Sequence, residues 1–431
     1  MGEPRKITRR QSLQVLSSAA LAAGLFGCRF PGAPRYDFSS ERPKRVAAII
    51  TAYAKGLHAD VLCGKILEGW KQDGGPGPNL ELASMYLDQF PSNDMSRAMS
   101  KKYNVPIFDT IEGAVTVGTD GVPVDGILCI GEHGNYPFNE KRQHLYPRRR
   151  FFTEIAAALE KHGRVVPVFN DKHLGPVWED AKWMYERARE LDIPFMAGSS
   201  IPVTYRTPDL DIPLGTDVEA AVCIGYSGLD IYGFHALEAY QAVVERRVGA
   251  EQGVRSVHCI PHQEMWKAVD AGKVRKDVLD AALEVVPKSA GADPRKLAGD
   301  NVALFHFEYV DGFLGNVLML PGFASRSAMA IKVAGEDRPR ACYFEEHAAP
   351  RHPHFAYLLK AVEAMFHTGR PAYPIERTYL TTGILDAALN SLYEGGKRLE
   401  TPELAISYEP VAYPHAPNPA ILGTMYDFSK G

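Results

Sequence analysis

Short apolar runs alternate with helix-like patterns through the first half of the chain. Strands are predicted at residues 45–50, 80–87, 105–108, 124–130, 165–169 and 193–198, and helices at 58–70, 96–103, 151–162 and 178–191. Strands and helices that alternate at this spacing favour a parallel sheet with helices on both faces. Residues 44–203 are therefore predicted to form an α/β domain with its ligand crevice at the carboxyl ends of the strands.

The pattern changes after residue 203, where predicted strands follow one another with few helices between them. The strands are predicted at 219–226, 254–260, 302–309, 314–320 and 342–344, and the helices at 232–247, 354–366 and 382–393. This pattern favours an open, mostly antiparallel sheet in an α+β domain over residues 204–431. Because an open sheet face can pair with a second copy of the chain, a homo-oligomer is expected.

A lysine ends the most regular strand–helix–strand unit. The strand at 165–169 leads through Asn170 and Asp171 to Lys172, and the helix at 178–191 and the next strand follow. Lys172 therefore stands at the carboxyl end of a parallel strand, where this fold places its ligands. A lysine in such a crevice can exchange a proton with a substrate hydroxyl.

The first 43 residues have a different character. Arg9 and Arg10 precede a moderately apolar run at 19–26, which is typical of a twin-arginine export signal and too short for a comfortable membrane span. We interpret residues 1–28 as this signal and 29–43 as a tether, with lipoprotein-type cleavage and lipid attachment at Cys28 as an open alternative. A periplasmic protein, or one anchored to the membrane and facing the periplasm, is expected. Because this route carries folded proteins, a cofactor bound before export is also expected.

Composition narrows the class of protein. The length of 431 residues predicts two domains, and 45% hydrophobic with 23% charged residues is ordinary for a globular protein. A net charge of -4 without a long basic stripe argues against a nucleic-acid partner. The sharpest basic cluster, Arg148, Arg149 and Arg150, is interpreted as the solvated start of a helix.

The cysteines and histidines do not favour a metal site. Five cysteines lie in apolar surroundings without CxxC spacing and are predicted to be reduced core residues: Cys63, Cys129, Cys223, Cys259 and Cys342. Two groups of histidine and acidic residues could supply metal ligands, and no metal is predicted at either: His347, His352 and His354, and Glu132, Asp171 and His173.

Four segments together resemble one known family. Residues 171–174 stand where that family carries Glu-Lys-Pro, and residues 233–238 resemble its Gly-x-His-x-Leu-Asp helix. Residues 355–371 and 382–391 resemble its last two helices. With the order of the domains, they resemble the glucose-fructose oxidoreductase / inositol dehydrogenase / rhizopine catabolism (Gfo/Idh/MocA) family over roughly residues 44–410. The resemblance implies a Rossmann-like, NAD(P)-binding first domain and a substrate-binding and oligomerisation second domain.

The resemblance also implies roles for single residues. Lys172 would be the acid/base, and His235 would share its proton or position a hydroxyl of a small carbohydrate substrate. Asp88 ends the second strand, where a carboxylate would accept from ribose hydroxyls and favour NAD over NADP; a turn cap is the alternative. Further candidates for cofactor contact are Thr51, Ala52, Tyr53, Glu132, His133 and Asp171, and for substrate contact Tyr205, Arg206 and Asp230.

The turn after the first strand departs from the family pattern. A dinucleotide site uses Gly-x-Gly-x-x-Gly there, and the three glycine positions are Ile50, Ala52 and Lys55 in this chain. Pyrophosphate binding in the usual pose is thereby weakened. The start of the following helix still offers free N–H groups and a partial positive charge.

A second departure concerns the partner of His235. The aspartate that many family members place four residues earlier is Ile231 here, and Asp230 is one position off. Three functions stay open. The chain is an exported NAD(P)-linked oxidoreductase for a sugar, polyol or sugar derivative. Alternatively, it is a redox-neutral enzyme in which retained NAD transiently oxidises a sugar during glycosidic cleavage or isomerisation. The third is a non-catalytic sugar-binding protein that has lost the cofactor.

Overall fold

The computed structural model describes residues 38–346 and 351–416, which lie within one compact unit of the chain. The predicted export signal, Cys28 and most of the predicted tether fall outside these residues, as does His347. Within the described ranges, no helix combines the length and apolar character needed to cross a membrane.

The first domain is built on a six-stranded sheet in which every pair is parallel. Its strand order is β3-β2-β1-β4-β5-β6, so the order reverses between β1 and β4. This order is the one that binds dinucleotides at the point of reversal. The bounds are Lys44–Ile50 for β1, Leu80–Leu87 for β2, Ile107–Phe108 for β3, Gly126–Ile130 for β4, Val168–Asp171 for β5 and Phe195–Gly198 for β6. The predicted parallel α/β domain is confirmed.

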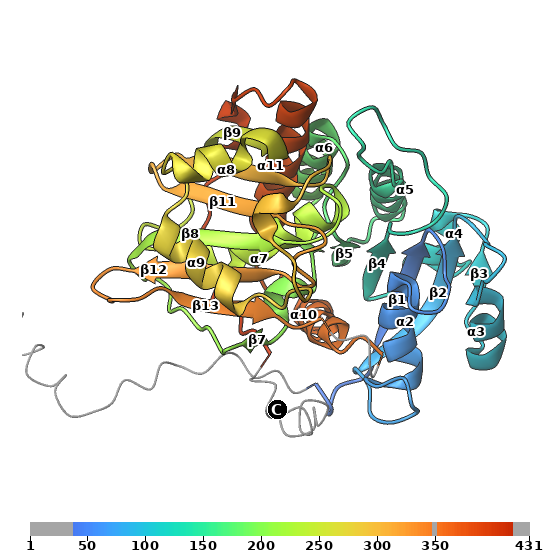
Figure 1. Ribbon diagram of the computed structural model, residues 1–431. Helices are drawn as coiled ribbons and strands as arrows, with labels where there is room; N and C mark the ends of the chain where they lie inside the picture. The colour runs from blue at the N-terminus through green and yellow to red at the C-terminus, as the bar shows by residue number, and fades with distance from the viewer. Residues whose placement is uncertain (1–37, 347–350, 417–431) are drawn as a thin grey trace, which may run out of the picture. The chain divides into compact units, whose positions relative to one another are not determined.

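Helices cover both faces of this sheet (Figure 1). One face packs against α2, α3 and α10, and the other against α4, α5 and α6. Their bounds are His58–Glu68, Ser96–Tyr103 and His354–Thr368 for the first group, and Ile111–Thr116, Arg148–Lys161 and Trp178–Glu190 for the second. Helix α10 comes late in the chain, yet its apolar residues join the core beneath α2. The second half of the chain therefore contributes one layer to the first domain.

The second domain is built on an eight-stranded sheet in the order β14-β9-β10-β11-β8-β12-β13-β7. Among the strands described, β8 and β11 pair in parallel and the other neighbours pair antiparallel, which confirms the mostly antiparallel sheet. The bounds are Arg206–Thr207 for β7, Val218–Gly225 for β8, Val254–Pro261 for β9, Ala303–Tyr309 for β10, Leu314–Met319 for β11, Ala328–Val333 for β12, Arg340–Phe344 for β13 and Leu399–Glu400 for β14.

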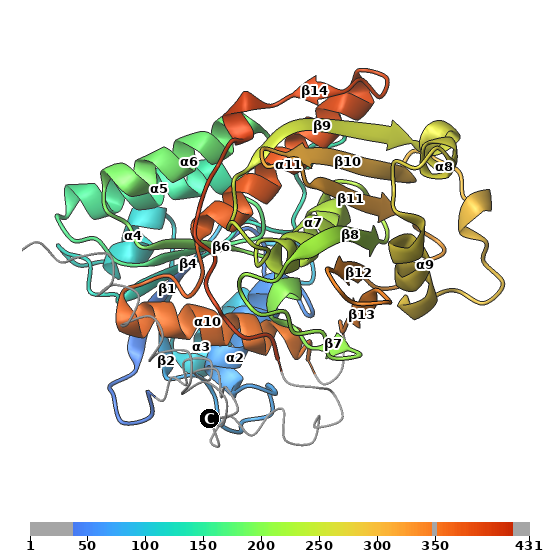
Figure 2. The same cartoon turned by 90° about the vertical axis from the view of Figure 1, so that its left-hand side faces the viewer.

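Helices pack on both faces of this second sheet, as Figure 2 shows. On one face lie α7 (Ile231–Val244) and α11 (Ile375–Tyr393), and α11 also contacts α6 of the first domain. On the other face lie α8 (His262–Asp270) and α9 (Lys276–Val285), which the sequence pattern did not predict. The homo-oligomer was expected because the second sheet was predicted to have an open face. Helices α8 and α9 cover at least part of that face.

The cysteines and possible metal ligands are placed as follows. All five described cysteines are free and buried, which confirms the prediction of reduced core residues. In the part of the chain that the structure describes, His, Cys, Asp and Glu side chains form no group of three or more suited to a metal ion.

Candidate active site

Lys172 lies directly after β5, between the two domains. Its backbone N–H donates to the Gly198 carbonyl at 3.1 Å and forms an isolated antiparallel bridge just beyond the parallel pairing of β5 with β6. Its φ of 73° then takes the chain into the left-handed region, which is costly for a side chain with a Cβ. The Lys172 Nζ reaches His235 on α7, 2.6 Å from its Nε2. The structure thus brings together the two residues that the resemblance implies as the proton-transfer pair.

Burial and a serine fix the state of the His235 ring. Burial, followed by the positive charge of Lys172, holds the pKa of His235 well below its usual range, so the ring is neutral at neutral pH. Its Nδ1 lies 2.5 Å from Ser199 Oγ, which also accepts from the Ile201 N–H. With the ring proton on Nδ1 donated to Ser199, the Nε2 lone pair faces Lys172. The neutral His235 ring is therefore arranged to accept a hydrogen bond from the Lys172 ammonium.

A buried ion pair lies beside Lys172. The Glu132 carboxylate at the end of β4 is 3.7 Å from Lys172 Nζ and accepts a hydrogen bond from Arg148. Burial alone would raise the pKa of Glu132, but the charges of Lys172 and Arg148 outweigh it and hold the pKa well below its usual range. Arg148 also contacts His173 Nε2 at 3.2 Å. A Cβ at position 131 would come within 2.7 Å of Arg148 Cγ, so Gly131 makes room for this side chain.

Arg148 corrects one sequence interpretation. The cluster was interpreted as a solvated helix start, but the Arg148 side chain is fully buried at the first residue of α5. Arg149 and Arg150 do follow the expectation, with side chains 40% and 44% exposed. Sequence spacing gave no sign of the difference, because Glu132 reaches Arg148 only through the fold.

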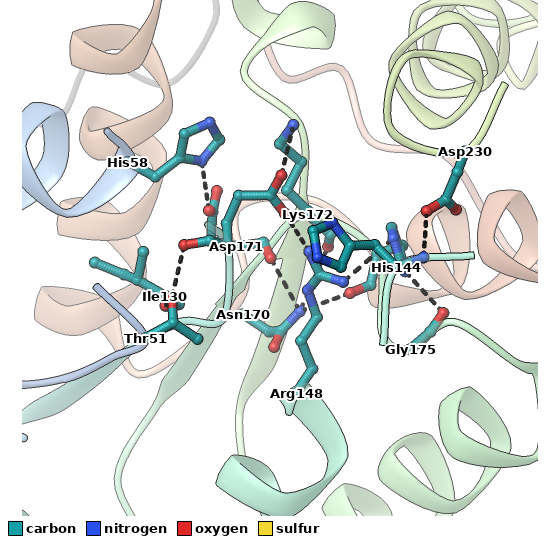
Figure 3. Close-up of polar contacts among 12 residues, drawn as sticks. Thr51, His58, Ile130, His144, Arg148, Asn170, Asp171, Lys172, Gly175 and Asp230 are labelled. Carbon is teal, nitrogen blue, oxygen red and sulfur yellow. Dashed lines mark hydrogen bonds and ion pairs between the residues drawn. The ribbon is translucent and has the colours of Figure 1, made fainter. Parts of the chain in front are cut away.

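A second polar contact closes the crevice on the side of the first domain. Asp171, the last residue of β5, lies 2.5 Å from Nδ1 of His58, the first residue of α2 (Figure 3). His133, after β4, packs edge-on to the His58 ring at 5.0 Å between centroids. Burial lowers the pKa of His133 to about 4, so it is neutral at neutral pH. Asp171 and His133 thus line the edge where a nicotinamide ring would lie in this fold.

Asp230 approaches the site from the second domain. It immediately precedes α7, is 8% exposed, and one carboxylate oxygen accepts from the His144 backbone N–H at 2.9 Å (Figure 3). Its other oxygen has no hydrogen-bond partner among the described residues. Burial raises the pKa of Asp230 to about 6, with Glu132 acting in the same direction, while the His144 N–H, Arg148 and Lys172 oppose the rise. Asp230 therefore loses its proton near neutral pH.

This raised pKa predicts a pH-dependent gain in stability for Asp230→Asn. The pKa rises from 3.8 to about 6 on folding, so the folded state favours the acid and loses stability as the pH climbs through that window. Asparagine stays neutral and still offers an oxygen to the His144 N–H. We expect the free energy of unfolding of the variant to exceed that of the wild-type protein by about 2–3 kcal/mol at pH 8, and to equal it near pH 4. Urea unfolding at both pH values measures this, and equal stability at pH 8 would contradict it.

The residues predicted to hold a cofactor occupy the expected edge of the first sheet. The turn after β1 contains Thr51, Ala52 and Tyr53, all buried, and Thr51 Oγ1 donates to the Glu132 carbonyl at 2.6 Å. The Tyr53 side chain packs in the core, so only its backbone is available to a ligand. Asp88, directly after β2, accepts from the hydroxyls of Tyr86 at 2.8 Å and Tyr136 at 2.6 Å, and pairs with Arg150.

The start of α2 offers cations in place of the glycine turn. Lys55 is exposed, and a Cβ at Gly56 would meet nothing within 4 Å, so the turn is open on that side. The Gly56 N–H donates to Asp60 in the first turn of α2 at 2.8 Å, and Arg351 lies 3.3 Å from the same carboxylate. These residues fit a dinucleotide in part: Asp88 would hold a ribose and the exposed Lys55 would face the phosphates, whereas Arg351 and the Gly56 N–H already bind Asp60.

Two predicted substrate residues lie elsewhere. Tyr205 is fully buried, and Arg206 is 3% exposed with its guanidinium donating to the Leu210 and Pro202 carbonyls. Arg206 also lies over the Phe344 ring. The structure does not bring this pair to the crevice of Lys172, because both side chains are committed to packing at the start of the second domain.

Several residues around Lys172 had no sequence signal. Ser199 follows β6, and Tyr232 opens α7 with its ring 5.8 Å from that of His235. The Tyr226 hydroxyl donates to Glu346, whose carboxyl pKa is raised by burial. Serine, tyrosine and glutamate at ends of elements are common, so only their position in the fold distinguishes these.

Comparison with known proteins identifies the fold. No protein-family model and no curated protein matches the chain. GenD2 of gentamicin A biosynthesis, solved in complex with NAD, is 14% identical with a TM-score of 0.53, over 87% of this chain and 99% of its own. Myo-inositol 2-dehydrogenase from Lactobacillus plantarum is 11% identical with a TM-score of 0.51, over 83% and 99%. Myo-inositol dehydrogenase from Corynebacterium glutamicum is also 11% identical, with a TM-score of 0.50 over 83% and 98%.

These likenesses confirm the fold that the resemblance implied. The chain shares the two-domain architecture of these solved proteins, with a parallel first sheet and a mostly antiparallel second one. At identities of 11–14% the likeness shows the fold, and activity has to be argued from the site.

Proposed function

We propose that this protein is an NAD(P)-dependent oxidoreductase that acts on a sugar, polyol or sugar derivative. The observation that carries the proposal is the contact of Lys172 Nζ with His235 Nε2 at 2.6 Å, at the carboxyl end of a parallel strand beside the point where strand order reverses. The NAD complex of GenD2, which shares the fold, supports the choice of cofactor class. Asp88 favours NAD over NADP, because its carboxylate would repel a 2′-phosphate.

The residues divide the chemistry as follows. A nicotinamide bound at this edge would supply the acceptor for the hydride that leaves the substrate carbon. Lys172, in its neutral form, takes the proton from the substrate hydroxyl and keeps it as an ammonium, which donates a hydrogen bond to the neutral His235 ring. Glu132 stabilises the ammonium form of Lys172 from 3.7 Å. In the reverse direction the same atoms return the proton.

A cofactor measurement tests the proposal directly. Protein purified under native conditions is denatured, and the supernatant is assayed for nicotinamide by absorbance and mass; the apoprotein is then titrated with NAD and NADP by calorimetry. We expect NAD in the supernatant, or binding of added NAD in preference to NADP. Absence of both would overturn the proposal and leave the non-catalytic sugar-binding protein.

A redox-neutral variant of this function has its own support. Lys172 and His235 are only 3% and 7% exposed, so a sugar oxidised at this pair would be held out of contact with bulk solvent. An enzyme that oxidises a sugar transiently and then reduces it again needs such retention. Stoichiometric NAD that never accumulates as NADH during turnover would favour this glycosidase or isomerase type.

Location and assembly belong to the same proposal. Arg9, Arg10 and the apolar run that follows support twin-arginine export, and Cys28 supports lipid attachment facing the periplasm. Export of a folded protein would carry the cofactor along. A homo-oligomer stays a prediction, and it would have to use surface other than the strands that α8 and α9 cover.

A further inference from the structure

A cavity of about 580 Å³ opens beside the active site, at the start of α7. Asp230, Ile231 and Tyr232 form one wall. The other walls come from a loop of the first domain, the start of α8, the end of α11 and the segment before β10. Its volume is within the roughly 300–1,000 Å³ typical of small-molecule sites. Among the described residues that line it, neither Lys172 nor His235 appears.

The cavity lies next to the proton-transfer pair, with Tyr232 of α7 between them. Tyr232 lines the cavity and has its ring centroid 5.8 Å from that of His235. Asp230 lies five residues before His235, about 7.5 Å along a helix axis. A ligand with one end in this cavity would therefore need about one further sugar ring to reach Lys172 and His235.

The loop that forms the first-domain wall is held to the second domain. Gln143 is fully buried and donates to Asp386 on α11 at 2.7 Å. Arg142 pairs with Asp300 at 2.8 Å. These contacts hold the loop over the cavity, so this wall is built from both domains.

The lining suits a neutral polyhydroxyl ligand. The exposed large hydrophobic side chains of the described residues include three aromatics, Phe90, Phe138 and Tyr393, and the two most exposed, Phe138 at 59% and Tyr393 at 57%, line this cavity. Aromatic faces at a rim give apolar surface on which a sugar ring can stack. Inside, the free oxygen of Asp230 is an acceptor that lacks a donor among the described residues, which a hydroxyl would satisfy. The charged side chains of the lining carry both signs, Lys141 and Arg142 against Glu140, Asp230 and Asp300, so the lining has no excess of positive charge that would select an anion.

We propose that this cavity is a carbohydrate subsite, so that the substrate is a disaccharide or longer glycoside whose non-reacting sugar lies between Phe138 and Tyr393. The assignment of the reacting sugar to Lys172 rests on the proposed function, whereas the subsite itself does not. A free monosaccharide would fill only one of the two positions and would bind more weakly.

Binding to immobilised sugars tests the subsite. The full-length protein is applied to an array of glucose, galactose, mannose, xylose and N-acetylglucosamine, each as monosaccharide and as α- and β-linked homodisaccharide. We expect at least one disaccharide to bind about tenfold or more tightly than its monosaccharide. The double variant Phe138→Ala/Tyr393→Ala should lose this preference, and Lys276→Ala, exposed on α9, should keep it.

The outcomes separate the subsite from the dehydrogenase proposal. Equal binding of mono- and disaccharides, no binding of any sugar, or a disaccharide preference that survives the double variant would each overturn the subsite. The NAD content of the same preparation is measured independently. Disaccharide preference in a protein that neither carries nor binds NAD would support the subsite and overturn the oxidoreductase.

Discussion

Replacing Lys172 by methionine should abolish most turnover while leaving the fold and the cofactor content unchanged. Methionine fills a similar volume and cannot exchange a proton, so the variant removes the base that lies 2.6 Å from His235. General acid–base catalysis contributes about 10²–10⁴-fold, and we expect a loss in kcat of that order. Steady-state kinetics on a substrate found by screening measures the loss, and the NAD content of the variant is measured beside it.

Control measurements distinguish the loss of proton transfer from an effect on packing. Lys182→Met on α6 removes a lysine that is 53% exposed, and it should leave kcat unchanged. The dependence of kcat on pH gives a second readout. The part of the curve that depends on ionisation of the base should disappear in Lys172→Met. A Lys172→Met variant with near wild-type kcat and an unaltered pH profile would remove the assigned role.

The strands and helices that were predicted well have clear local signals. The predicted bounds of β2 and α3, residues 80–87 and 96–103, are those observed. Helix α11 was predicted from residue 382 but begins at Ile375. Its first turns are stabilised by contacts distant in sequence: Arg377 pairs with Glu245, and Thr381 donates to Glu238 at 2.7 Å. Local propensity does not contain this information.

Other elements were missed for a related reason. Strand β12 at 328–333 is a short apolar run, and periodicity does not distinguish such a run from part of a buried helix. The strand carrying Lys172 was predicted at 165–169 and lies at Val168–Asp171. Its pairing with β4 and β6 sets the register and places Asp171 inside the strand, which sequence alone does not specify.

Some residues of the candidate site could likewise be predicted from the sequence, and others could not. Lys172, His235 and Asp88 could be placed because each ends a strand or matches a motif, and order along the chain was sufficient. Arg148 and Ser199 could not, because their roles depend on contacts made across the fold. The position of Asp230 was predicted, whereas its raised pKa follows from burial that only the structure reveals.

Arg148→Met should be among the most destabilising single changes in the chain. The Arg148 and Glu132 side chains are 0% and 2% exposed, and removing the cation leaves a carboxylate buried beside Lys172 alone. Breaking a buried pair by removing one partner costs about 3–5 kcal/mol, and because Lys172 still faces the Glu132 carboxylate at 3.7 Å, we expect a loss near the lower end of that range. The free energy of unfolding in urea measures this loss, and the His173 contact of Arg148 disappears with it.

The neighbouring arginine supplies the control. Arg149 is 40% exposed and pairs with Asp180 at 3.0 Å, so Arg149→Met on the same turn of α5 should cost less than about 1 kcal/mol. Adding Glu132→Gln to Arg148→Met removes the uncompensated charge and should recover part of the loss. If Arg148→Met is no less stable than Arg149→Met, then a proton or a water molecule replaces Arg148 as the partner of the Glu132 carboxylate. In that case the Arg148–Glu132 pair does not organise the crevice. If the double variant is stable but inactive, Glu132 is needed to hold Lys172 in place for its proton rather than to hold the fold.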